Sequence, residues 1–172
     1  RTLVDFGLAA AAEEQLNRIR GNTAAPADTR NTAVVRLGEL AYSRGQYKEM
    51  LTALTRDLVE PLNEDDPMAV HDLRARAFMR LGDFPSALGA YDDARRIDSL
   101  PPYMAYNRAI TQMRTGALDD GIDSLRRVGR VDIPSFELAA LRDKANLTLG
   151  YQLLKQERYD EARDAFRRIR LE

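Results

Sequence analysis

The sequence contains no cysteine, and its single histidine is His71. The absence of cysteine excludes disulfide bonds, thiolate zinc sites, iron–sulfur clusters and a thiol nucleophile. Any histidine-rich metal site or serine–histidine–aspartate triad would have to use His71, which we interpret as a packing residue of a helix. The Glu64–Asp65–Asp66 cluster lacks the alternating spacing and the glycine of a calcium loop. We therefore expect no enzyme, no cofactor and no metal site.

The sequence also lacks an excess of charge of one sign. It contains 26 basic and 27 acidic residues, which give a formal net charge of −1. Binders of nucleic acid or of acidic membranes need a strongly basic surface, so neither class of partner is expected. Two local arginine clusters, Arg126–Arg127–Arg130 and Arg167–Arg168–Arg170, are interpreted as solvated faces near helix ends. No apolar run approaches the roughly 18 residues of a membrane span, so direct membrane insertion is not expected.

What the sequence does contain is an internal repeat. Four segments align: RLGELAYSRGQYKEMLTAL (36–54), RARAFMRLGDFPSALGAY (74–91), RAITQMRTGALDDGIDSL (108–125) and LGYQLLKQERYDEARDAF (149–166). Each has a turn residue, a large apolar residue two positions later, a mostly small residue three further on, and a second large apolar residue four beyond. These sets are Gly45, Gly82, Gly116, Glu157; Tyr47, Phe84, Leu118, Tyr159; Met50, Ala87, Gly121, Ala162; and Leu54, Tyr91, Leu125, Phe166.

The repeat predicts pairs of antiparallel helices. A glycine after a helix takes the left-handed conformation that ends it, and a small residue lets two helices approach closely. Met50 and Gly121 depart from the small alanine of the other units, which predicts looser or shifted packing there. Because no useful stretch alternates in the manner of a strand, the predicted fold class is all-α.

The pattern resembles the tetratricopeptide repeat (TPR) family, whose repeat is about 34 residues long. The best matches are LGDFPSALGAYDDA (81–94) and residues 149–166, and Leu37–Gly38 and Leu149–Gly150 stand where the family has its Leu-Gly pair. The resemblance implies an α-solenoid, a right-handed superhelix of about four TPR-like repeats, that binds segments of partner proteins in its concave groove.

The predicted organisation is an N-terminal helix and link (1–30) followed by the array (31–172), with units near 31–65, 68–100, 102–131 and 134–171. The apolar side of the helix at 2–20 would present Leu3, Phe6, Leu8, Leu16 and Ile19, and residues 21–28 would be a flexible link. Helices are expected to begin at Asp28–Thr29, at Asp66–Pro67, at Pro101–Pro102 and at Asp132 with Pro134. The last of these should run to Lys155, about two turns longer than its counterparts.

The first helix of each pair should line the groove. Counting back from each turn, the groove residues are Tyr42, Arg76, Met79, Arg80, Tyr103, Tyr106, Ile110, Met113, Arg114, Tyr151 and Lys155, with Val35, Glu39, Asp72, Leu147 and Leu154 beside them. Tyrosine and methionine suit peptide capture, and the arginines and lysine would form a basic rim. Some of these residues could instead pack between repeats.

We interpret the chain as a protein-interaction module, a scaffold or adaptor that binds a partner peptide or helix. The alternatives are a structural array for self-association or for packing against further domains, and a regulatory domain attached to an enzyme. The ends of the sequence suggest a fragment of a longer protein. A periplasmic or envelope location in a bacterium is favoured over the cytoplasm, because a cysteine-free composition is compatible with export.

Overall fold

The computed structural model describes residues 3–54, 68–131 and 135–169, with side chains from Leu8 onward. Within these ranges the secondary structure is helical throughout and contains no strand, which confirms the all-α fold class. The helices are α1 (Leu3–Gly21), α2 (Ala27–Ser43), α3 (Tyr47–Ala53), α4 (Ala69–Leu81), α5 (Phe84–Ile97), α6 (Pro102–Arg114), α7 (Leu118–Val128), α8 (Phe136–Lys155) and α9 (Tyr159–Phe166).

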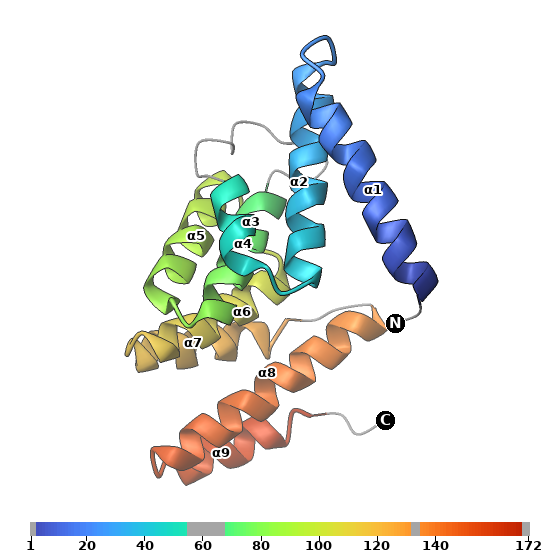
Figure 1. Ribbon diagram of the computed structural model, residues 1–172. Helices are drawn as coiled ribbons and strands as arrows, with labels where there is room; N and C mark the ends of the chain where they lie inside the picture. Colours follow the sequence, from blue (N-terminus) through green and yellow to red (C-terminus); the bar gives the residue numbers. More distant parts are fainter. Residues whose placement is uncertain (1–2, 55–67, 132–134, 170–172) are drawn as a thin grey trace. The chain divides into compact units, whose positions relative to one another are not determined.

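The helices fall into two compact units, residues 1–97 with α1 to α5 and residues 98–172 with α6 to α9. In unit 1, α2 packs on α3 and α4 on α5, and in unit 2, α6 packs on α7 and α8 on α9. Figure 1 shows each of these partners lying side by side. The four predicted helix pairs are therefore present.

The predicted turn residues take the left-handed conformation. The φ angles are 79° at Gly45, 77° at Gly82, 91° at Gly116 and 60° at Glu157. In every pair the second helix begins two residues later, at the predicted large apolar residue. The turn pattern in the sequence therefore determined the register of all four pairs.

Glu157 is the one predicted turn residue that has a Cβ in this conformation. We expect Glu157→Gly to raise the free energy of unfolding by about 0.5–1 kcal/mol, because the relief of left-handed strain exceeds the extra backbone entropy of glycine. The matched control is Gly82→Ala, which should lower it by about 1 kcal/mol. Urea denaturation of the three proteins measures both effects, and a destabilised Glu157→Gly protein would contradict the assignment.

Gly121 packs more tightly than we predicted. A Cβ at this position would lie 2.4 Å from Cγ of Met113 and 2.9 Å from the carbonyl oxygen of Ala109. Glycine therefore brings α6 and α7 together at their crossing, and our expectation of looser packing was wrong for this pair. In unit 1, Met50 is completely buried in a core with Leu54 and Val70.

Of two predicted helix starts within the described residues, one is confirmed and the other is wrong. Pro101 and Pro102 open α6 as predicted, with Pro102 in the first turn where its missing N–H costs nothing. By contrast α2 begins at Ala27 after Pro26, and no side chain caps it, so the predicted cap at Asp28–Thr29 is wrong. Asp28 instead lies within the first turn, where the helix dipole favours a carboxylate.

The starts of α4 and α8 lie next to segments that the structure does not describe. Asp66–Pro67 and Asp132 with Pro134 are outside the described residues, as are the Glu64–Asp65–Asp66 cluster and Arg170. At α8 the cap is Ser135, whose hydroxyl accepts a hydrogen bond from the Leu138 amide. The end of α8 at Lys155 is as predicted, and its 20 residues exceed the 13 of α4 and of α6 by about two turns.

The helix α1 packs against α2 through a short turn (Figure 1). We expected a flexible link at 21–28, but the turn is hydrogen-bonded, with the Arg30 guanidinium donating to the carbonyl oxygens of Thr23 and Ala25. Leu16 and Ile19 are half-buried, whereas Leu8 is exposed, contrary to our prediction. The alanines at 9–12 give α1 little amphipathic character, so the sequence did not define which face meets α2.

Candidate partner-binding faces

In unit 1 three predicted groove residues gather between α2 and α4. The guanidinium carbon of Arg76 lies 5.2 Å from the ring centroid of Tyr42, and Nε of Arg80 donates a 3.3 Å hydrogen bond to the Tyr42 hydroxyl. The Tyr47 ring packs edge-on against Tyr42 at 5.2 Å. These contacts join the two helices, so the cluster serves packing within unit 1.

The charges of this cluster are partly compensated. Nε of Arg76 forms a 2.9 Å ion pair with Asp72, whose side chain is buried. The hydrogen bond from Arg80 to the Tyr42 hydroxyl raises the pKa of Arg80. Met79 is half-buried and accepts a 3.6 Å hydrogen bond from the Tyr91 hydroxyl, so it packs between α4 and α5. His71 is buried in α4, as expected of a packing residue.

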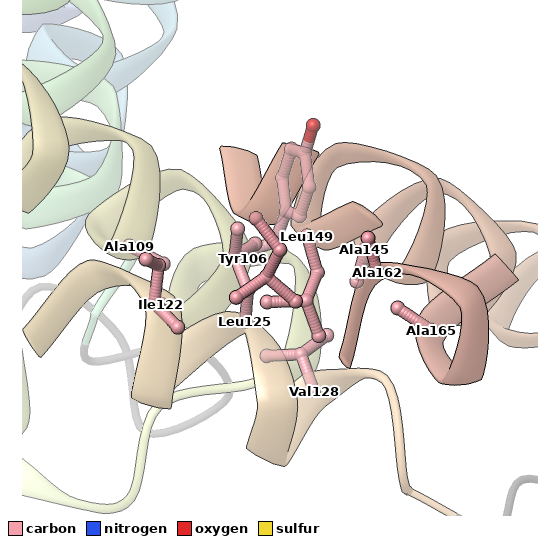
Figure 2. Close-up of a cluster of buried hydrophobic side chains, with 10 residues drawn as sticks. Tyr106, Ala109, Ile122, Leu125, Val128, Ala145, Leu149, Ala162 and Ala165 are labelled. Atoms are coloured by element: carbon pink, nitrogen blue, oxygen red, sulfur yellow. The ribbon is translucent and has the colours of Figure 1, made fainter. Parts of the chain in front are cut away.

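In unit 2 Tyr106 belongs to the core, although we predicted that it would face the groove. Its ring is buried with Ala145 and Leu149 in the cluster drawn in Figure 2, where its hydroxyl oxygen points away from the other labelled side chains. That oxygen lies 3.2 Å from Oγ1 of Thr148. Tyr106 therefore packs α6 against α8.

The other predicted residues of α6 divide between packing and exposure. Ile110 and Met113 are half-buried against the same core. Tyr103 and Arg114 are exposed. The α6 side of the predicted groove thus offers less apolar surface than the sequence suggested.

Four exposed large apolar side chains of unit 2 lie on α8. Leu147, Tyr151 and Leu154 are 42%, 56% and 40% exposed, and Phe136 at the first turn is 90% exposed. The spacings of eleven, four and three residues place all four side chains on one face of the helix, over about 27 Å. We call Phe136, Leu147, Tyr151 and Leu154 the α8 stripe.

The opposite face of α8 is buried, with Ala145, Leu149 and Leu153 in the core of unit 2. Tyr151 is also held in place, because its ring packs edge-on against Phe166 of α9 with 5.6 Å between centroids. The helix is therefore anchored on one side and presents the stripe on the other.

Of the stripe, only Phe136 was missed by the sequence analysis. We counted groove positions back from each turn over the length of an ordinary repeat, and Phe136 lies in the two extra turns of α8. Its distance of eleven residues from Leu147 was the signal that could have found it, since residues eleven apart share a helical face.

Two lysines border the stripe. Nζ of Lys144 lies 4.9 Å from the ring centroid of Tyr106, which places this edge of α8 toward α6. Lys155, eleven residues further on, lies on the same edge and is exposed. Of the predicted basic rim of Arg80, Arg114 and Lys155, only Lys155 lies on α8, and Lys144 was not predicted.

The described residues contain no group of three or more histidine and acidic side chains placed to hold a metal ion. In residues 3–54, 68–131 and 135–169 we also find no helical segment with the length and hydropathy of a transmembrane span.

The chain is a helical-repeat protein. Its helices form pairs with left-handed turns and small residues at the crossings, and α8, the first helix of the last pair, presents an exposed stripe. Residues 73–130 match the tetratricopeptide repeat family model. Residues 73–130 are therefore similar to tetratricopeptide repeats, as the resemblance in the sequence implied.

Solved structures share the fold. A MamA (RS-1) double mutant is 12% identical, with a TM-score of 0.69 over 92% of this chain and 83% of that one. MamA (MSR-1) is 14% identical, with a TM-score of 0.66 over 96% and 87%. The nearly identical TPR-like repeats of a Podosopora anserina putative kinesin light chain are 14% identical, with a TM-score of 0.71 over 96% and 87%. No curated protein matches the chain. At these identities the likeness shows the tetratricopeptide-repeat solenoid fold.

Proposed function

We propose that the chain is a non-enzymatic interaction module that binds a segment of a partner protein along the α8 stripe. The observation that carries the proposal is the exposure of four large apolar side chains at helical spacing on one face of α8. Exposed apolar side chains gathered on one face can mark an interaction site, and a straight stripe suits a helix laid alongside it.

The proposal narrows the groove that the sequence predicted. In unit 1, Arg76 and Arg80 of α4 both contact Tyr42 of α2. In unit 2, Tyr106 and Met113 are occupied in packing. Tyr103, Arg114, Tyr151 and Lys155 of the predicted set are exposed, and of these Tyr151 and Lys155 lie on α8 with Leu147 and Leu154.

Peptides selected on the immobilised chain from a random display library provide the test. We expect the double variant Leu147→Glu/Leu154→Glu to bind selected peptides at least about thirtyfold more weakly, because each glutamate removes apolar contact and buries a charge. Fluorescence anisotropy of the labelled peptides measures the affinities.

The matched control is Leu8→Glu/Leu81→Glu, which places the same charges at exposed leucines outside the stripe. It should bind like the parent protein. Unchanged affinity of the stripe variant, or a library that enriches no peptide, would contradict the proposal. Both variants should keep the circular dichroism and melting temperature of the parent, since the four leucines are exposed.

We keep the periplasm or cell envelope of a bacterium as the proposed location, and the lack of cysteine is its support. Fractionation of the source cells with detection of the native protein tests it. Recovery in the cytoplasmic fraction alone would contradict it.

A further inference from the structure

The charges of unit 2 are unevenly distributed along its helices. α6 contains Arg108 and Arg114 and no acidic residue, and α8 carries Glu137 and Asp143 in its N-terminal half but no acidic residue from Lys144 to Lys155. Six further acidic side chains lie on the second helices, namely Asp119, Asp120 and Asp123 on α7 and Asp160, Glu161 and Asp164 on α9. Asp143 is paired with Arg142 at 3.2 Å, so an excess of positive charge is confined to the C-terminal half of the stripe, at Lys144 and Lys155.

Several acidic groups of the second helices are already compensated. Arg126 pairs with Asp123 at 2.7 Å and with Glu161 of α9 at 2.8 Å, and Arg158 pairs with Glu161 at 2.7 Å. The hydrogen bond from Arg158, with the nearby charge of Arg126, holds the pKa of Glu161 below its usual value. These carboxylates are engaged by neighbouring arginines.

Lys144 and Lys155 differ from those arginines. Both are exposed, and neither forms an ion pair within the part of the chain that the structure describes. Contact with the Tyr106 ring restrains Lys144 at the edge of the stripe. The two lysines are about 17 Å apart along the helix, at the spacing of three turns.

We propose that the occupant of the α8 stripe is an amphipathic helix of a partner protein whose apolar face is bordered by acidic residues. The inference rests on the proposed function and adds the chemistry of the partner. Apolar side chains of the partner helix would cover the stripe, and carboxylates three turns apart on one edge would meet Lys144 and Lys155. Two charge pairs at the rim would add specificity and speed association more than they add affinity.

Two synthetic peptides of about 20 residues test the charge requirement. Both carry leucines at helical spacing, and one has glutamates along the edge where the other has glutamines. We expect the glutamate peptide to bind about tenfold more tightly at low salt, with most of this advantage lost at high salt. Anisotropy titrations measure both affinities, and circular dichroism should show that the peptide gains helix on binding.

The double variant Lys144→Glu/Lys155→Glu should abolish the preference for the glutamate peptide. Lys48→Glu is the matched control, because Lys48 is the third lysine and lies exposed on α3 of unit 1. The control should keep the full preference.

The possible failures are distinguishable. Equal affinity for the two peptides would contradict the requirement for acidic residues on the partner helix. It would not contradict the proposed function. Absence of binding by either peptide would count against both. Sedimentation velocity tests whether a second copy of the chain covers the stripe instead. A dimer that the Leu147→Glu/Leu154→Glu variant fails to form would show that it does, and would overturn this inference.

Discussion

Leu149→Ala is expected to lower the free energy of unfolding by about 3 kcal/mol, whereas Leu147→Ala should change it by less than about 0.5 kcal/mol. The two leucines are two residues apart on α8 and have the same chemistry. Leu149 is 1% exposed and packs in the core with Tyr106 and Leu125, while Leu147 is 42% exposed on the stripe. Removing the Leu149 side chain leaves a cavity between α6, α7 and α8.

Urea denaturation followed by circular dichroism measures both changes, with Leu147→Ala as the internal control for helix propensity. Alanine is the better helix former, so any propensity effect should favour both variants equally. Equal destabilisation of the two proteins would mean that α8 is rotated relative to the core, and the stripe would then be wrongly assigned.

Gly121→Ala should destabilise the protein by about 1–3 kcal/mol, although alanine occupies the same position in two other repeats. The added Cβ would lie 2.9 Å from the Ala109 carbonyl oxygen, which belongs to the backbone and cannot rotate away. The two helices must therefore separate, and the contacts around the α6–α7 crossing would weaken.

Gly89→Ala is the matched control. Gly89 is exposed within α5, and a Cβ there meets nothing within 4 Å. We expect this substitution to stabilise the protein by about 0.5–1 kcal/mol, because alanine loses less backbone entropy in a helix. Thermal and urea denaturation of both variants give the comparison, and a neutral Gly121→Ala would show that α6 and α7 are not in close contact.

The helix pairs could be predicted from the sequence because their determinants are local. The three determinants of a pair lie within ten residues of each other. They are a left-handed turn residue that ends the first helix, an apolar residue two positions later that begins the second, and a small residue at the crossing. Glu157 shows the strength of the combination, since the turn forms there without a glycine. Helix starts were less predictable, because two candidate starting residues, Pro26 and Asp28, lie two positions apart and the sequence does not decide between them.

The candidate site was less predictable because exposure depends on the neighbouring helix. Counting from the turn identifies the face of a helix but not whether another helix covers it, and Tyr106 is covered by α8. The contacts of Arg80 with Tyr42 and of Lys144 with Tyr106 join residues 38 positions apart in each case, and no local pattern encodes them. Phe136 escaped because α8 exceeds the usual repeat length.

The most direct test of the account is methyl NMR of leucine-labelled protein titrated with a peptide selected on the chain. We expect the methyl resonances of Leu147 and Leu154 to shift most, that of Leu149 to shift little because it faces the core, and those of Leu8 and Leu81 of unit 1 not to move. Shifts that spare Leu147 and Leu154 while the peptide binds would contradict the assignment of the α8 stripe as the interaction surface.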